Sequence, residues 1–220
     1  MVSYNEAKEL AEKGFLTSSC CPAFVSYVRK QFPALADFIS HNLSPMATIS
    51  KWIKDHHPEA HIIFVGPCIA KKKEVQLEPV KKIVDYSLTF EELQAMFGAK
   101  EYDLASFPSI ELDTASYYGR IFARAGGLTE AVKEALKEQN SDFDAKPISV
   151  DGLENIRMAL LKAKGPNREF NFIEGMACNG GCIGGPCSLS HEMRDRMEVE
   201  KYGKAAGERR IDEAIAPYKD

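Results

Sequence analysis

The sequence predicts an α/β fold in which parallel β-sheets are flanked by helices. Short apolar runs alternate with amphipathic segments that carry helix start and stop signals, a pattern typical of such folds. The 220 residues are 45% hydrophobic, which is enough to build a core. All six cysteines fall into three short loops that contain Gly or Pro, and α/β folds place their functional loops at the carboxyl ends of strands.

Three helices are expected in the first part of the chain. Residues 4–13, 22–32 and 45–56 are the helical segments, and each is followed closely by Gly or Pro. Pro22 and Pro45 occupy the first turns of the second and third helices, where proline is favoured.

Strands are expected at residues 61–65, at 84–88 (a short strand or extended piece), at 147–150 and at 170–173. The first is a continuous apolar run, which predicts a buried parallel strand. It leads directly into the second cysteine loop, and the last strand leads into the third. Residues 99–125 have no clear period.

The remaining helices are expected between and after these strands. Thr89 and Glu92 have the spacing of a capping box, and Asp151 is expected to cap a helix over residues 153–162. An amphipathic helix is expected at 128–138, and a long charged helix from about residue 189.

Composition argues against several classes of protein. Lys plus Arg is 28 and Asp plus Glu is 32, a formal net charge of −4, so nothing favours nucleic acid. No apolar stretch approaches the roughly 18 residues that a membrane span needs, and the polar N-terminus is not a secretory signal. We therefore expect a cytoplasmic protein without membrane contact, in which reduced thiols are favoured over disulfides.

Four of the cysteines are candidate metal ligands. Cys21, Cys68, Cys178 and Cys182 supply the four thiolates that a cubane iron–sulfur cluster needs. The alternatives are zinc ligands or buried structural thiols, although Cys-x3-Cys is not the usual zinc spacing.

The two other cysteines are interpreted differently. Cys20 adjoins Cys21, so it is expected to point elsewhere; a thiol beside a metal site can carry a proton if acids or hydroxyls continue the route to solvent. The alternative for Cys20 is an inert buried thiol. Cys187 is interpreted as a small hydrophobic residue in a loop.

The three loops resemble the signature segments of the iron-only (di-iron) hydrogenases. In that family the segments read roughly Thr-Ser-Cys-Cys-Pro, Met-Pro-Cys-x-x-Lys-x-x-Glu and Glu-x-Met-x-Cys-x-x-Gly-Cys-x-x-Gly-Gly. Residues 19–22, 67–74 and 174–185 match them in order and internal spacing. The chain thus looks like the C-terminal part of the catalytic domain that the large subunit carries.

The resemblance implies how the domain is organised. Residues 1–220 would form a partial catalytic domain with two sub-lobes, at about 1–145 and 146–220, and an iron–sulfur site between them. Family members carry sequence before this point, so the chain is interpreted as a fragment, a split subunit or a truncated reading frame that needs the missing N-terminal hydrogenase region.

The resemblance also implies a cofactor and its ligands. The four candidate cysteines would hold a 4Fe–4S cluster, and Cys182 would also bridge to a di-iron subsite that carries carbonyl, cyanide and a bridging dithiolate. Lys71 matches the lysine that donates a hydrogen bond to a cyanide ligand; otherwise it is a solvated charge. Met176 and Phe122 match residues that wall the di-iron pocket, with plain core packing as the alternative. By the same resemblance Pro67, beside Cys68, would belong to this pocket.

A proton path can be carried over in the same way. Cys20 matches the thiol nearest the open iron position, Ser40 matches the family serine, and Glu6 and Glu9 resemble the two path glutamates. Their alternatives are an exposed helix face for the glutamates and a cap or turn hydroxyl for Ser40.

Departures from the family pattern, at Gly66, at Met46 and at the end of the third loop (residues 185–189), resemble a divergent branch of that family. Gly66 stands where many members have methionine, and Met46 stands where many have glutamine near the di-iron unit. One hypothesis is that Met46 restores the thioether lost at Gly66. We expect a shifted potential, reactivity or oxygen response.

The function implied by the resemblance is the reversible reduction of protons to dihydrogen in an anaerobic cell. A ferredoxin-type carrier would supply electrons, and hydrogenase maturation proteins would supply the di-iron unit. The alternatives are a non-catalytic iron–sulfur assembly factor and a hydrogen-sensing module. Cys20 and Lys71 favour a di-iron site, because neither would ligate the cubane.

Overall fold

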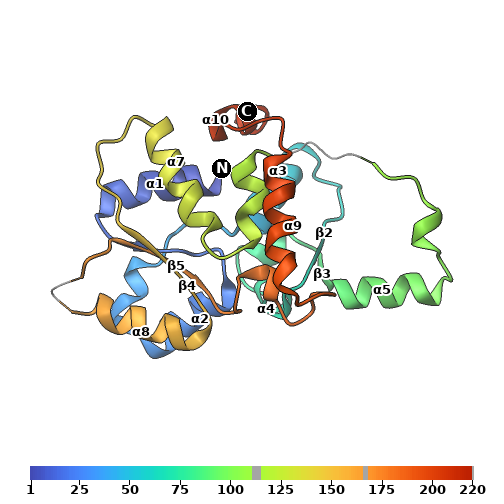
Figure 1. Ribbon diagram of the computed structural model, residues 1–220, viewed down its shortest axis with the longest axis horizontal. Helices are drawn as coiled ribbons and strands as arrows, with labels where there is room; N and C mark the ends of the chain where they lie inside the picture. Colours follow the sequence, from blue (N-terminus) through green and yellow to red (C-terminus); the bar gives the residue numbers. More distant parts are fainter. Residues whose placement is uncertain (111–114, 166–167, 220) are drawn as a thin grey trace.

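Strands and helices alternate through the computed structural model, which describes residues 1–110, 115–165 and 168–219. The strands form two parallel sheets, one with the order β1-β5-β4 and one with the order β2-β3. Helices flank both faces of the larger sheet (Figure 1). The predicted α/β class with parallel sheets is therefore confirmed.

The larger sheet lies between two pairs of helices. On one side Phe172 and Met176 of β5 pack in a core cluster with residues of α1 and α7. On the other side Ile173 packs with residues of α2 and α8. The elements of this layer are α1 (Val2–Lys13), β1 (Leu16–Thr17), α2 (Pro22–Gln31), α7 (Gly127–Glu138), β4 (Pro147–Asp151), α8 (Leu153–Ala163) and β5 (Phe172–Met176).

The smaller sheet pairs β2 (Ile63–Gly66) with β3 (Tyr86–Thr89). The strand expected at 61–65 is parallel, but the expectation that it is buried is wrong, because Ile63 is 53% exposed and Gly66 alone in β2 is buried. With two strands, each strand of this sheet is also an edge strand. Beside it lie α3 (Pro45–His56), α4 (Ile69–Glu74) and α5 (Phe90–Ala99), which projects away from the rest of the chain (Figure 1).

Short helices make up most of the remaining structure. The expectation of a long charged helix from residue 189 is wrong in extent, because α9 begins four residues later and ends at Lys204. Near this end of the helix, Gly203 packs against Ile121. The remaining elements are η1 (Pro33–Phe38), η2 (Val80–Lys82), η3 (Leu104–Ser106), α6 (Tyr117–Arg120), η4 (Ile121–Ala123), η5 (Cys182–Gly184), α9 (Met193–Lys204), α10 (Ile211–Ala214) and η6 (Ala216–Tyr218).

The expected cap of α8 is also wrong. Gly152 is the N-cap residue, and no side chain caps this helix. The Asp151 carboxylate instead accepts a hydrogen bond from the backbone N–H of Gly180, 2.5 Å away. A residue expected to serve its own helix therefore holds the third cysteine loop.

The larger sheet takes strands from both predicted sub-lobes. Leu16 of β1 pairs with Phe172 of β5, so the sheet joins residues on both sides of the division at residue 145. The two sub-lobes, and a site between them, stay a prediction. Among the described residues, no helix is long and apolar enough to cross a membrane.

Candidate functional site

Each of the three cysteine loops begins where a parallel strand ends. Cys20 and Cys21 follow β1, Cys68 follows β2, and Cys178 follows β5. Cys21 and Cys68 are also the N-cap residues of α2 and α4. The topology thus brings thiols from distant parts of the sequence to the same end of the strands, as the α/β pattern predicts.

Hydrogen bonds join the three loops to one another. In the third loop, Cys187 N donates to Pro67 O of the second loop at 3.2 Å. In β5, Gly175 N donates to Ser18 Oγ of the first loop at 3.2 Å. In α4, Lys71 Nζ donates to Cys20 O of the first loop at 3.5 Å.

The four candidate ligand thiols lie within electrostatic range of one another. Burial raises the pKa of Cys182 to about 12, and the neighbouring Cys21 and Cys68 raise it further. Burial and the same two neighbours raise the pKa of Cys178. Mutual repulsion of thiolates is what a cation at their centre would relieve.

The donor set fits an iron–sulfur cluster better than a single ion. All six cysteines are free thiols, so the disulfide alternative is not realised. In the part of the chain that the structure describes, no three His, Cys, Asp or Glu side chains converge closely enough to hold one metal ion. A cubane takes its four thiolates at four separate corners, so it does not need that convergence.

The third loop is shaped by contacts with the segment before α7. Gly181 has a φ of 90° and forms a bridge with Arg124, and Ala125 N donates to Gly180 O at 3.0 Å. A Cβ atom at Gly181 would lie 2.5 Å from Ala125 N. Only glycine is compatible with both the positive φ and this close approach.

Glu174 of β5 anchors α7 beneath this loop. Its fully buried carboxylate accepts hydrogen bonds from Gly126 N at 2.8 Å and from Thr129 N at 2.7 Å. These are orphan donors of the first turn of α7, where an anion is favoured. The strand that leads into Cys178 is therefore fixed to the helix behind it.

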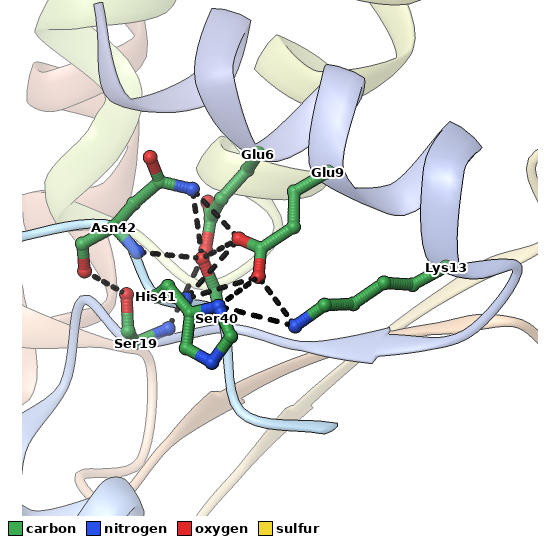
Figure 2. A network of polar contacts seen from close by, with 7 residues as sticks. All are labelled: Glu6, Glu9, Lys13, Ser19, Ser40, His41 and Asn42. Carbon is green, nitrogen blue, oxygen red and sulfur yellow. Dashed lines mark hydrogen bonds and ion pairs between the residues drawn. The ribbon is translucent and has the colours of Figure 1, made fainter. Parts of the chain in front are cut away.

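A polar network surrounds Glu9 on α1 (Figure 2). The Ser40 hydroxyl donates to Glu9 Oε2 at 2.9 Å, and Lys13 Nζ lies 2.8 Å from Oε1. Asn42 Nδ2 and the backbone N–H of His41 also donate to this carboxylate. Burial opposes ionisation of Glu9, but these donors hold its pKa below the usual range.

For Glu6, one helical turn earlier, the pKa is shifted in the opposite direction. It is fully buried, so the alternative of an exposed helix face is wrong for it. Burial raises its pKa to about 8, against the opposing effects of Ser19 N–H and the Ser40 hydroxyl. Its Oε1 accepts from Ser19 N at 3.4 Å, and its Oε2 has no hydrogen-bond partner among the described residues.

Cys20 lies close to Glu6. Burial raises the pKa of this thiol well above its ordinary value, and the nearby Glu6 carboxyl is the next cause. The structure therefore brings together Cys20, Glu6, Ser40 and Glu9, the four residues predicted to form the proton path.

Lys71 is buried and ion-paired. Its Nζ lies 2.6 Å from Glu74 Oε2, and both side chains are almost fully covered. The alternative of a solvated charge is therefore wrong for Lys71, although Lys72 beside it does lie at the surface.

Three of the four predicted pocket residues lie with the cysteines. Met176 is buried in the same core cluster as Cys20, and Phe122 packs against that cluster. Pro67 joins the second and third loops through its carbonyl. Met46 instead packs in a separate cluster with Val80 and Val84.

The Phe64 ring lies against Gly66. A Cβ atom at Gly66 would lie 2.7 Å from the Phe64 ring, so this ring fills the place where a side chain at position 66 would begin. Phe64 packs against the cluster that contains Met46. The idea that Met46 supplies a replacement thioether stays a hypothesis.

The contacts of several polar residues at the site were not predicted from the sequence. Lys13 could have been found from its four-residue spacing to Glu9, and Glu74 from its three-residue spacing to Lys71, since such pairs share a helix face. Asn42 and Asp151 carry no such signal, because their partners are distant in sequence.

Comparison with known proteins bears on the identity of this site. A model of the family "Iron only hydrogenase large subunit, C-terminal domain" matches residues 1–186. The chain is 27% identical to NADP-reducing hydrogenase subunit HndD of Solidesulfovibrio fructosivorans over 87% of its length, and 26% identical to iron hydrogenase 1 of Clostridium pasteurianum over 84%. It spans 40% of each of these relatives.

A second group of relatives has a different description. The cytosolic Fe-S cluster assembly factor NAR1 of Kluyveromyces lactis is 33% identical over 95 residues, which are 43% of this chain and 20% of that protein.

Solved structures have the same fold. A variant of FeFe-hydrogenase HydA1 from Chlamydomonas reinhardtii aligns with a TM-score of 0.70 at 17% identity, over 97% of this chain and 74% of that one. Another structure, described as revealing stepwise H-cluster assembly in HydA, aligns with a TM-score of 0.65 at 16% identity, over 96% and 72%.

Proposed function

The chain belongs to the family named for the C-terminal domain of the iron-only hydrogenase large subunit, and we propose that it is a catalytic segment for the reversible reduction of protons to dihydrogen. The observation that carries the proposal is the run of proton-bearing groups from the buried Cys20 through Glu6 and Ser40 to Glu9. A structural cluster alone does not need such a route.

We assign the cofactor to the three loops. Cys21, Cys68, Cys178 and Cys182 would hold a 4Fe–4S cluster, and Cys182 would bridge it to a di-iron subsite. When bound, the two units would supply electron transfer and an open iron position for dihydrogen chemistry. The mutual pKa effects of the thiols support this ligand set.

The pocket residues would orient the di-iron unit. The buried ammonium of Lys71 would donate to a cyanide ligand, which a compact cation suits, while Glu74 balances its charge. Met176, Phe122 and Pro67 would exclude water, and Met46 would act only from behind Phe64.

The proton route would run outward along α1. Cys20 would hold and pass on a proton at its thiol, with Glu6 as its buried neighbour. Ser40 and Glu9 would carry the proton on, since a hydroxyl both gives and accepts a proton. Glu9, held ionised beside Lys13, would exchange it with solvent.

The share of the relatives that the chain spans implies partners. Because the chain spans 40% of the hydrogenase relatives, we propose that it acts with an N-terminal hydrogenase region, a ferredoxin-type electron carrier and maturation proteins, in the cytoplasm.

The test is hydrogen evolution by the matured protein with the N-terminal region of a hydrogenase relative supplied. Activity is expected in the wild type, loss of activity in Cys20→Ala, and retention in Cys187→Ala. Infrared spectra should show carbonyl and cyanide stretches. A matured wild type without these bands would remove the di-iron proposal.

The second candidate is a non-catalytic iron–sulfur assembly factor, which is favoured by the similarity to NAR1. This function predicts a cubane on the same cysteines, no carbonyl or cyanide bands, and no effect of Cys20→Ala on cluster content. The buried Lys71 beside Cys20 argues against it, because neither group is needed by a cubane.

A further inference from the structure

The Ser40 hydroxyl has no hydrogen-bonding capacity left. A serine hydroxyl offers one proton and two lone pairs. The proton goes to Glu9 Oε2 at 2.9 Å. Both lone pairs face Asn42, whose backbone N–H lies 3.2 Å away and whose Nδ2 lies 2.9 Å away. A new donor to Ser40 must therefore displace one of the two Asn42 donors.

The orientation of the Asn42 amide follows from its neighbours. Nδ2 also donates to Glu9 Oε2 at 3.0 Å, and an ionised carboxylate can only accept. Rotating the amide by half a turn would set its oxygen against that carboxylate. The backbone of Asn42 is fixed separately, since its carbonyl accepts from Ser19 Oγ at 2.6 Å. The side-chain amide is thus the donor that can move.

One carboxyl oxygen of Glu6 lacks a hydrogen-bond partner in the described part of the chain. Its Oε2 is buried and unpaired among the described residues, and Figure 2 shows its carboxyl group in the same network as Ser40 and Glu9. A protonated Glu6 needs an acceptor for its O–H, and burying an O–H without one is costly. The Ser40 hydroxyl lies close enough to Glu6 to lower its pKa, but its hydrogen bonds join it to Glu9 and to the two Asn42 donors.

We propose that the Asn42 side chain gates proton transfer between Glu6 and Ser40. With the amide in place, the route is interrupted at this step. When Nδ2 turns away, the Glu6 O–H takes the freed lone pair of Ser40. Ser40 then accepts the proton from Glu6 and gives its own to Glu9, so Glu6 becomes a carboxylate, Glu9 becomes a carboxylic acid, and Ser40 is unchanged.

The inference rests on the proposed function for its purpose, but its test does not need the cofactor. The test is the infrared C=O stretch of neutral Glu6 in the unloaded 220-residue protein, assigned by its loss in Glu6→Gln. Asn42→Leu keeps the size of the side chain and removes its donors. The Glu6 band is expected to move to lower wavenumber, because its O–H gains the Ser40 acceptor.

The control is Asn5→Ala, an exposed position on α1, which is expected to leave the band in place. An Asn42→Leu band at the wild-type position overturns the gate, and so does a wild type without the band at neutral pH. If Asn42→Leu does not fold, Asn42→Ala replaces it with the same expectation.

The loaded enzyme separates the two proposals. If hydrogen evolution is found, Asn42→Leu should raise the rate severalfold where proton delivery is limiting, and Ser40→Ala should abolish that gain. A shifted band in a protein that never evolves hydrogen supports the gate and removes the hydrogenase function. Hydrogen evolution together with an unshifted Glu6 band supports the hydrogenase function and overturns the gate.

Discussion

Two carboxylates one helical turn apart on α1 are driven in opposite directions by their surroundings. Glu6 is fully buried and has an unpaired oxygen among the described residues, so its pKa rises to about 8. Glu9 faces several donors, including Lys13, and its pKa is lowered. At neutral pH one is therefore mostly an acid and the other a base, which is the division of roles that a relay requires.

The raised pKa of Glu6 makes stability depend on pH. Between the unfolded value of 4.5 and the folded value of about 8, the folded protein binds the extra proton. The free energy of unfolding therefore falls as the pH rises through this window, by up to about 1.4 kcal/mol per pH unit. Glu6→Gln should remove this fall, as measured by urea unfolding across the same window.

Glu9→Gln is the matched control with the opposite sign. The lowered pKa of Glu9 stabilises the fold above its unfolded pKa, and this gain is lost as the pH falls through the folded pKa. Glu9→Gln should thus be less stable than wild type at neutral pH and should approach it in acid. Equal pH profiles for the two variants would contradict the assignment.

The buried pair of Lys71 and Glu74 predicts a strong single-variant effect. Lys71→Met leaves the Glu74 carboxylate covered and unpaired, which should lower the free energy of unfolding by about 3 kcal/mol. Lys71→Met/Glu74→Gln should recover most of this loss. Lys51→Met, which breaks the exposed pair with Asp55, should change stability by less than about 1 kcal/mol.

At the scale of elements, local sequence signals predicted the helices well, but contacts between residues distant in sequence were not predicted. Ser44 caps α3, and Thr89 and Glu92 form the expected capping box, because caps act within a few residues. Asp151 looked like another cap, but its carboxylate accepts from Gly180 in a distant loop. A side chain's role cannot be predicted from local sequence when its hydrogen-bond partner lies in a distant segment.

Strand β2 carries a prediction about Gly66. A Cβ atom there would press on the Phe64 ring at 2.7 Å, so Gly66→Ala should cost about 1–3 kcal/mol in the free energy of unfolding. Phe64→Leu/Gly66→Ala should be closer to wild type. Gly98→Ala, where a Cβ meets nothing within 4 Å in the exposed helix α5, should stabilise by about 0.5–1 kcal/mol.

At the scale of the whole molecule, the sequence could predict which cysteines group together, but it could not predict the contacts that hold their loops. The cysteine spacings in residues 19–22, 67–74 and 174–185 indicated which thiols belong together. The contacts that hold them, such as Glu174 with the first turn of α7, depend on tertiary packing between segments 45 residues or more apart in sequence. Whether Met46 belongs to the site also depended on packing, which places it with Val80 and Val84.

Cluster loading should stabilise the whole fold. A cluster that binds the folded chain and not the unfolded one adds about 2.7 kcal/mol at a hundredfold excess over its dissociation constant. Anaerobic reconstitution with iron and sulfide should therefore raise Tm in calorimetry. Cys68→Ala should lose both the iron and the rise, and Cys187→Ala should keep both. A rise in Tm without bound iron would argue against the ligand set.

The pairing of β1 with β5 has a consequence for biosynthesis. Leu16 reaches its partner Phe172 only after the 156 residues up to that position have been made, and sheets of such high contact order form slowly. The first cysteine loop therefore waits, without its neighbours, while the ribosome completes the rest. If Cys182 is a cluster ligand, as proposed, insertion of the cluster must follow translation of Cys182. A nascent chain stalled before β5 would present Cys20 and Cys21 to oxidants and chaperones instead.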